Sequence, residues 1–220
     1  MTSGVLPSVM EILDKVTLKS IKENTDIDLP EAEAMILTET DGYTWEEVDA
    51  QMEVVLRVLK QNHPIAIKTA KDEKDRLYLW KARKSAYATL ARASHSFVLD
   101  DVTVPISKIP ELLVGIQEIG KRNVMTIATY GHAGDGNLHP QLLYDEYDPK
   151  QVERVEKAEE EIFKLAISLN GTLSGEHGIG LSKANYMTLE HDPVEMTLMR
   201  QLKRTLDPNN IMNPGKRALD

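Results

Sequence analysis

Residues 124–143 read VMTIATYGHAGDGNLHPQLL, with one apolar run on each side of a glycine-rich centre. Two such runs around a short glycine-rich stretch are typical of a β-hairpin. The three glycines of the centre permit turns with positive φ and let the backbone approach a ligand closely. The stretch therefore predicts two paired strands, at 124–130 and 138–143, joined by a tight turn.

Helices and short strands are expected to alternate on both sides of this hairpin. Apolar runs predict strands at 34–38, 65–69 and 97–104. Apolar stripes or capping residues predict helices at 9–22, 44–63, 107–119, 148–169 and 193–206, the third of them capped by Ser107 with Pro110 in its first turn. The absence of glycine and proline predicts a long helix at 72–92. This order indicates an α+β fold, in which helices cover a twisted, mainly antiparallel sheet.

Composition excludes several classes of protein. The chain has 220 residues, enough for one large domain or two small ones, and a net charge of −9 from 26 basic and 35 acidic residues. An acidic chain without a basic tract argues against nucleic acid or an anionic membrane as the partner. No apolar run is long enough for a membrane span, and the first residues lack the pattern of a signal peptide. The absence of cysteine excludes thiolate chemistry and suits a cytoplasmic protein.

Glycine and histidine gather in two short segments. Of the 12 glycines, 3 lie in residues 131–136 and 4 in residues 171–180. Three of the six histidines, His132, His139 and His177, lie in these two segments or within three residues of them. Glycine at this density marks turns or backbone that approaches a ligand. The two segments are therefore the candidate functional site.

The hairpin predicts that His132 and His139 lie near each other across the mouth of its turn. Two imidazoles and one carboxylate form a metal site with open positions for substrate. Glu176 is the carboxylate that we expect to join them. Asp135 is the competitor, although an aspartate in a Gly-Asp-Gly turn more often bonds to its own backbone. On spacing alone, hydrogen-bonded histidines beside a turn that binds nothing remain an equal alternative.

The long helix at 72–92 carries a second candidate group. Trp80, Arg83 and Tyr87 are spaced i, i+3 and i+7, so they share one face. A guanidinium beside aromatic rings can clamp a carboxylate. The alternative is an arginine stem that packs on a tryptophan at the helix surface.

Three motifs together resemble a known family: GHAGDGNLHP at 131–140, SGEHGIG at 174–180 and DPNNIMNPGK at 207–216. They are similar to the C-terminal half of the FAD-linked 2-hydroxyacid oxidases, which include glycolate oxidase and the D-lactate and D-2-hydroxyglutarate dehydrogenases. The resemblance spans nearly the whole chain and implies one domain over residues 1–220, with a ferredoxin-like antiparallel sheet. It also implies that FAD is held mainly by a preceding FAD-binding domain or subunit, which this sequence does not contain.

The resemblance implies a role for each matching position of the two glycine-rich segments. His132, His139 and Glu176 correspond to the ligands of a divalent metal, with zinc, manganese and iron as candidates. His177 corresponds to the catalytic base.

The resemblance also implies how substrate and flavin are bound. Arg83 matches the arginine that pairs with the substrate carboxylate, Tyr87 shares its face, and Asn213 lies where the family tail approaches the flavin. The chain departs from the D-2-hydroxyglutarate enzymes at Gln141, where they have asparagine, and at 99–101, where they have a substrate-binding lysine. We therefore expect a small 2-hydroxy monocarboxylic acid as the substrate.

Two other classes of function are weighed against this one. A metal-dependent hydrolase would use the same two histidines and carboxylate to activate water, and this chain alone would turn over its substrate. A non-catalytic module would only dimerise or dock, and would bind no stoichiometric metal. If the chain is the flavin-dependent half, we expect it to be colourless in isolation and to expose an apolar docking face that favours a homodimer.

Overall fold

One sheet of six strands organises the computed structural model, which describes residues 4–219. The strands are β1 (Val9–Asp14), β2 (Ala34–Glu39), β3 (Ser96–Leu99), β4 (Val102–Thr103), β5 (Thr126–His132) and β6 (Asn137–Tyr144). Their order is β2-β1-β5-β6-β3, with β4 also pairing with β6, and the paired strands are antiparallel. The α+β fold expected from the sequence is therefore confirmed.

The predicted hairpin is the pair β5 and β6. Its register places Tyr130 opposite His139 and His132 opposite Asn137. Gly136 in the turn has φ of +85°, and a Cβ atom there would lie 2.0 Å from the carbonyl oxygen of Val104. Only glycine fits this position, because a side chain would be strained by φ and would collide with the neighbouring backbone.

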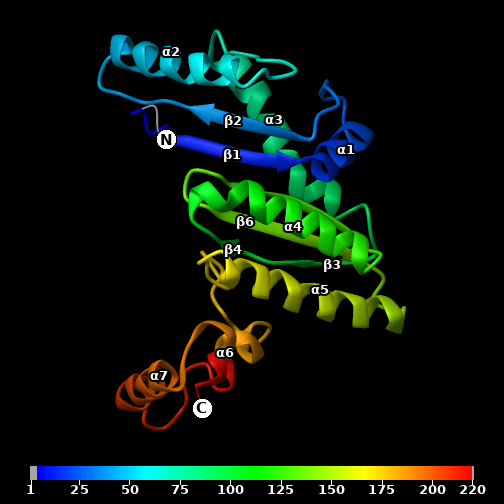
Figure 1. Ribbon diagram of the computed structural model, residues 1–220, viewed down its shortest axis with the longest axis vertical. Coiled ribbons are helices and arrows are strands. Elements are labelled where there is room, and N and C mark those ends of the chain that lie inside the picture. The colour runs from blue at the N-terminus through cyan, green and yellow to red at the C-terminus, as the bar shows by residue number, and fades with distance from the viewer. Residues whose placement is uncertain (1–3, 220) are drawn as a thin grey trace.

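Four helices cover the two faces of the sheet. One face packs against α1 (Lys15–Asn24) and α3 (Glu73–Leu90), and the other against α4 (Ile109–Arg122) and α5 (Pro149–Ser168). Figure 1 shows α4 and α5 on the viewer's side of the sheet and α3 behind it. Two apolar cores result, the larger of them around α4 and α5. Burial in these two layers is the main force that holds the sheet.

The second half of the sheet has the ferredoxin-like order. The chain runs from β3 and β4 through α4, β5, β6 and α5, and then returns so that Thr172 forms an antiparallel bridge with Thr103. This is a βαββαβ path in which the last, very short strand lies beside the first. The return sets the glycine-rich segment that follows, residues 174–180, at the same edge of the sheet as the hairpin turn.

The remaining helices lie outside these layers. Helix α2 (Trp45–Gln61) runs beside β2 at one end of the molecule, and α6 (Met187–Glu190) and α7 (Pro193–Leu206) lie at the other (Figure 1). Helices α6 and α7 share a small core with the C-terminal segment, formed by Met187, Met196 and Leu219. Within residues 4–219, no helix combines the length and apolarity that crossing a bilayer requires.

The prediction of one helix over residues 9–22 is wrong. Residues 9–14 form β1, and α1 begins only after Asp14, whose side chain accepts a hydrogen bond from the backbone N–H of Thr17. Strand β1 is central and covered on both faces, since Ile12 packs in one core and Leu13 in the other. A strand buried on both faces loses the alternation that distinguishes it from a helix.

Three further predictions are corrected. Residues 65–69 form no strand. They alternate between apolar and polar side chains, but a strand also needs the edge of a neighbouring strand with which to pair. The strand expected at 97–104 is divided into β3 and β4, because Asp100 and Asp101 turn inward between them. Ser107 does not cap α4, since it lies inside a short 3₁₀ turn, Ile106–Lys108, although Pro110 does occupy the first turn of α4.

The other predicted elements are confirmed. Strand β2 lies at 34–39, and the helices expected near 44, 72, 148 and 193 are α2, α3, α5 and α7. Their N-terminal caps are Thr44, Asp72, Asp148 and Asp192, each accepting a hydrogen bond from the first turn.

Candidate metal centre and active site

His132 and His139 face each other at the end of the hairpin. His132 ends β5 and His139 lies in β6, so their side chains rise from neighbouring strands. The centroids of the two imidazoles are 5.3 Å apart, with the rings nearly perpendicular. His139 is only 4% exposed, whereas His132 is partly open to solvent. The hairpin thus brings together the two histidines that the sequence pattern singled out.

Glu176 completes a group of three potential metal ligands. Its Oε1 atom lies 3.1 Å from Nε2 of His139 and 3.8 Å from Nε2 of His132. One ligand atom from each residue lies within 4.8 Å of the others. Ligands placed tetrahedrally around zinc at 2.0–2.1 Å are separated by about 3.3 Å. Two imidazole nitrogens and one carboxylate oxygen at these separations fit a divalent transition metal with open coordination positions.

Asp135, the competing carboxylate, turns away from this group. Its Oδ1 accepts a hydrogen bond of 3.1 Å from the backbone N–H of Asn137, so it closes the hairpin turn. A hollow of about 290 Å³ begins beside Glu176. It is lined by Thr103, Asp135, Asn137, Thr172, Ser174, Gly175 and Glu176.

His177 lies against the same three residues. Its ring is stacked on that of His139, with centroids 5.1 Å apart and an angle of 9° between the planes. Its Nε2 atom is 3.5 Å from Oε1 of Glu176. The side chain is 41% exposed, so it can meet a ligand that enters from solvent. This position is beside the potential metal ligands rather than among them.

A buried ion pair anchors the loop that carries Glu176 and His177. Oδ2 of Asp101 accepts hydrogen bonds from the backbone N–H groups of Glu176 and His177, at 2.6 and 2.8 Å, and from the hydroxyl of Ser174. Its Oδ1 lies 2.5 Å from Nζ of Lys183, which also donates to the carbonyl oxygens of Asp101 and Leu173. Both charged side chains are almost fully buried. The loop is therefore held by its backbone, which leaves the two side chains free for a ligand.

The sequence analysis missed Glu11, which connects the metal group with Arg83. Glu11 lies in β1 and is 7% exposed. Its Oε1 is 2.7 Å from Nδ1 of His132, and its Oε2 accepts a hydrogen bond of 2.6 Å from Nε of Arg83. A glutamate inside the apolar run VMEILD was the available signal, because glutamate is rarely buried without a partner.

Arg83 packs on a tyrosine rather than on Trp80. Its Cζ atom lies 4.9 Å from the centroid of the Tyr130 ring, whereas the Trp80 indole donates to Glu39 and meets Lys84. The Nη atoms of Arg83 remain available for a carboxylate. Tyr87, further along α3, is half exposed and meets Phe97 edge to face.

Burial and charge set the protonation of the inner residues. Burial lowers the pKa of His139, and the positive charges of His132, His177 and Arg83 lower it further against the opposing effect of Glu176. Burial raises the pKa of Tyr130 to about 12. The imidazole of His139 is therefore neutral at neutral pH, and Tyr130 is a neutral phenol.

Gln141 and Asn213 differ in their burial and in their distance along the chain from the two histidines. Gln141 follows His139 by two residues in β6, is fully buried, and receives a weak hydrogen bond of 3.4 Å from the Tyr130 hydroxyl. Its amide nitrogen finds no hydrogen-bond partner among the described residues. Asn213 is exposed in the C-terminal segment, where its side chain accepts a hydrogen bond from Lys216.

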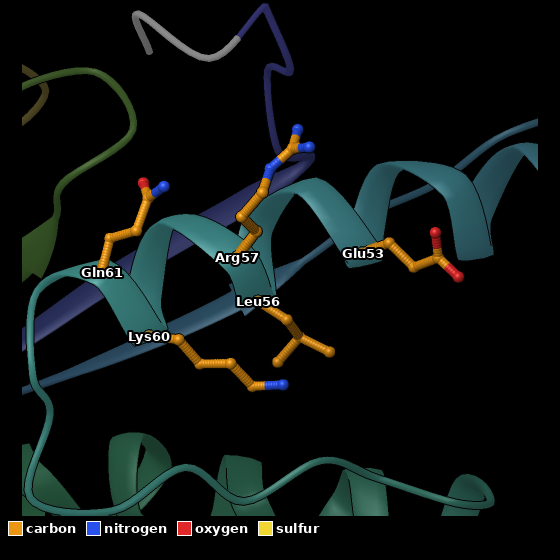
Figure 2. Close-up of a pocket in the computed structure, with 5 residues that line it drawn as sticks. All are labelled: Glu53, Leu56, Arg57, Lys60 and Gln61. Atoms are coloured by element: carbon orange, nitrogen blue, oxygen red, sulfur yellow. The ribbon is translucent and has the colours of Figure 1, made fainter.

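A second hollow, of about 510 Å³, lies on α2, far along the chain from these residues. It is lined by Glu53, Leu56, Arg57, Lys60 and Gln61 (Figure 2). Figure 2 shows the side chains of Leu56 and Lys60 on one side of the helix and those of Arg57 and Gln61 on the other. All five come from one helix, and Glu53, Arg57 and Lys60 carry charges of both signs, as is typical of a helix surface that contacts solvent.

Comparison with known proteins agrees with the motifs and the fold. The glycolate oxidase subunit GlcD of Bacillus subtilis is 40% identical over 213 residues, which are 96% of this chain and 45% of that protein. GlcD of Escherichia coli K12 is 32% identical, over 97% of this chain and 43% of its own length. A mitochondrial cytochrome D-lactate dehydrogenase of Arabidopsis thaliana is 32% identical, over 98% and 38%. The chain thus spans less than half the length of these relatives.

The fold is shared with a more distant enzyme. The structure of p-cresol methylhydroxylase with bound substrate superposes with a TM-score of 0.65 at 14% identity, over 96% of this chain and 47% of that one. The family model described as FAD linked oxidases, C-terminal domain, matches residues 1–217. This chain therefore belongs to the family of C-terminal domains of FAD-linked oxidases.

Proposed function

We propose that this chain is the substrate- and metal-binding half of an FAD-dependent oxidoreductase that oxidises a small 2-hydroxy acid to the 2-oxo acid. Glycolate and D-lactate are the candidate substrates, because relatives that match nearly the whole chain bear the names of enzymes for these acids. The observation that carries the proposal is the approach of His132, His139 and Glu176 within 4.8 Å, with the ring of His177 stacked beside them.

The proposed metal ligands are His132, His139 and Glu176. A divalent cation at this place supplies Lewis acidity, which makes the α-hydroxyl of the substrate easier to deprotonate. Zinc, manganese and iron all accept two imidazoles and one carboxylate, so the donor set favours this group of metals over calcium or magnesium.

The other polar residues then have complementary tasks. The Nη edge of Arg83 pairs with the carboxylate of the substrate, and Tyr87 borders the same side of the site. Nε2 of His177 takes the proton from the hydroxyl. A small monocarboxylate is the expected substrate, because the chain departs from the D-2-hydroxyglutarate enzymes at Gln141 and at residues 99–101.

Flavin supplies the acceptor for the hydride that leaves the α-carbon, which no protein side chain can be. We propose that a separate FAD-binding domain or subunit holds it and that Asn213 approaches it from this chain. The products are then the 2-oxo acid, a proton on His177 and reduced flavin. Location in the cytoplasm stays a prediction, since the D-lactate dehydrogenase relative is named as mitochondrial.

Metal binding is the first test, and it needs only this chain. Calorimetry of metal-free protein should find about one zinc or manganese ion per chain, and the double variant His132→Ala, His139→Ala should lose this binding. The double variant His95→Ala, His191→Ala is the control, since neither histidine belongs to the group. Equal metal binding by all three proteins would overturn the ligand assignment.

Activity is the second test. The chain alone should be colourless and should not reduce a dye with glycolate or D-lactate, whereas pairing it with an FAD-binding domain should restore flavin reduction by one of these acids. Hydrolysis of an ester or amide by the zinc-loaded chain alone would instead favour the metal-dependent hydrolase.

A further inference from the structure

Glu11 is a buried carboxylate whose two oxygen atoms serve two different functional side chains. Its place in β1 is directly opposite His132 in the register of β1 and β5. Oε1 lies 2.7 Å from Nδ1 of His132, and Oε2 lies 2.6 Å from Nε of Arg83. Because Glu11 is only 7% exposed, water competes little for either oxygen.

The contact with His132 has a chemical consequence for its other nitrogen. A carboxylate accepts hydrogen bonds and cannot donate one, so Nδ1 of His132 must carry the proton. In the neutral imidazole, Nε2, which lies 3.8 Å from Glu176, is then left with its lone pair free. Free Nε2 is the form of imidazole that binds a metal.

The contact with Arg83 has a consequence for its orientation. Nε of Arg83 is occupied by Glu11, and its guanidinium is packed over Tyr130 at 4.9 Å. These two contacts fix the plane of the guanidinium, while neither Nη group has a hydrogen-bond partner among residues 4–219. A guanidinium fixed in this way can receive a carboxylate in the two-pronged geometry that is specific to arginine.

We propose that Glu11 is a positioning residue that holds the metal ligand His132 and the carboxylate-binding Arg83 in one network. Glu11 touches neither metal nor substrate, and it acts only through these two side chains. The inference rests on the proposed function, which assigns the roles of His132 and Arg83. It goes beyond that function because it makes the two halves of the site, metal and carboxylate clamp, depend on one residue of β1.

The chain contains a matched control for Glu11. Glu39 lies in the neighbouring strand β2 and also bridges a strand to an arginine of α3, since its carboxylate accepts hydrogen bonds from Arg76 at 2.7 and 2.9 Å and from Trp80. Glu39 meets no histidine in these contacts. Glu39→Gln therefore weakens a strand-to-helix ion pair without touching the proposed network.

The first measurement is the tautomer of His132 in the metal-free chain. Nitrogen-15 spectra at about pH 8, where an ordinary histidine is neutral, should show His132 protonated at Nδ1 in the wild type and in Glu39→Gln. In Glu11→Gln the amide offers one acceptor oxygen for two donors, so His132 should populate the Nε2–H tautomer and the Nε–H signal of Arg83 should shift. His132→Ala assigns the resonance.

The second measurement is zinc affinity by calorimetry. Loss of the partner that orients a metal-binding histidine typically weakens binding by about 10- to 100-fold. We expect this loss in Glu11→Gln and wild-type affinity in Glu39→Gln. If Glu11→Gln does not fold, Glu11→Asp retains the charge on a side chain too short to reach both partners, and it should also bind zinc more weakly.

The outcomes separate this inference from the proposed function. A wild-type chain that binds no zinc would overturn the proposed metal centre, while the tautomer of His132 would still decide whether Glu11 positions it. A Glu11→Gln chain that keeps both the Nδ1–H tautomer and the zinc affinity of the wild type would overturn the role of Glu11. Equal losses in Glu11→Gln and Glu39→Gln would overturn it too, because they would reflect the strand-to-helix ion pair in general.

Discussion

Lys183 and Asp101 form an ion pair inside the core, with Nζ 2.5 Å from Oδ1 and each side chain at most 5% exposed. Lys183 follows the loop at 174–177, and Asp101 separates β3 from β4. The pair therefore ties the end of the glycine-rich segment to the sheet. Asp101 ionises readily in spite of its burial, which opposes ionisation, because Lys183 and the backbone N–H groups of His177 and Glu176 hold its pKa below the usual range.

Asp101→Asn should destabilise the chain strongly. The variant removes the carboxylate nearest to the buried ammonium of Lys183 and leaves it, among residues 4–219, only Asp100, whose Oδ1 lies 4.0 Å away. Removing one partner of a buried ion pair typically costs about 3–5 kcal/mol. Urea unfolding of the metal-free chain measures the change. Glu160→Gln, which breaks the exposed pair with Lys164, is the control and should cost less than about 1 kcal/mol. A loss for Asp101→Asn as small as that of the control would show that the buried pair is not what holds the loop.

Stability should also depend on two carboxyls beside this pair. Burial raises the pKa of Asp100 to about 6, with Lys183 opposing and Asp101 adding to the shift, and burial raises the pKa of Glu159 to about 7, with help from Asp100 and Glu156. The pKa of each carboxyl is higher in the folded chain than in the unfolded chain. At pH values between these two pKa values, the folded chain therefore binds more protons than the unfolded chain. Their contribution to stability is thus full below about pH 4 and is lost as the pH rises through 6 to 7.

Comparison of the wild type with Glu159→Gln isolates the effect of Glu159 on the pH dependence of stability. His139, whose pKa is lowered, has the opposite effect, but it is present in both proteins. The free energy of unfolding of the wild type, relative to that of Glu159→Gln, should fall between about pH 5 and about pH 8, by at most about 1.4 kcal/mol per pH unit. Glu153→Gln, an exposed position on the same helix, should leave the wild-type profile unchanged. Parallel profiles for the wild type and Glu159→Gln would contradict the raised pKa.

Substitutions of His177 and of Glu176 should have different effects on activity and metal content once an FAD-binding domain is present. Loss of a general base slows a reaction by about 10²- to 10⁴-fold. His177→Ala should therefore slow the reduction of flavin by the hydroxy acid while metal content stays close to that of the wild type, and Glu176→Ala should lose both. Stopped-flow absorbance with metal analysis checks this. If His177→Ala also loses the metal, His177 is a ligand and the base lies elsewhere.

Gln141 should contribute to substrate binding. Its buried amide nitrogen has no partner among the described residues, and an oxygen of the substrate would satisfy it. Gln141→Leu should weaken the binding of D-lactate to the zinc-loaded chain by about tenfold, the effect of one hydrogen bond. Calorimetry measures this, and Gln201→Leu on the exposed surface of α7 is the control. Unchanged affinity in Gln141→Leu would place the substrate elsewhere.

The apolar stripe of α7 should drive self-association of the isolated chain. Val194, Leu198, Leu202 and Leu206 are each more than half exposed and spaced four residues apart, so they share one face. The double variant Leu198→Glu, Leu202→Glu should be monomeric in sedimentation velocity at concentrations where the wild type is not. Thr197→Glu, Gln201→Glu adds the same charge at neighbouring positions and should still associate. A wild type that is monomeric throughout would contradict this.

Local patterns predicted the parts of the site that lie close together in the sequence. The hairpin was predictable because glycines mark its turn and apolar runs mark both strands, and this pairing is enough to set His132 beside His139. The caps of α2, α5 and α7 were predictable for the same reason, since a cap acts within one turn. Glu176 was expected beside the two histidines because it is the carboxylate of the second glycine-rich segment, and the resemblance to a family implied the same ligand role.

Contacts between distant segments could not be predicted in this way. Glu11 was missed because β1 is buried on both faces, so its pattern resembled part of a helix. The partnership of Asp101 with Lys183 joins positions 82 residues apart, and no rule of spacing relates them. Asp101 and Lys183 reveal themselves only as charges in buried surroundings, which a single sequence does not report, whereas Glu11 had the signal of its apolar neighbours.

The chain returns from α5 to Thr172, beside Thr103, so the site brings together two segments that are far apart in the sequence. Glu176 follows His139 by 37 positions, and α5 lies between them. A cation shared by the two would close this segment into a ring, and it would bind the native chain far better than the unfolded one. The cation would thus stabilise the packing of α5 on the sheet. Removal of the cation should therefore let residues 149–183 unfold locally before the hairpin does.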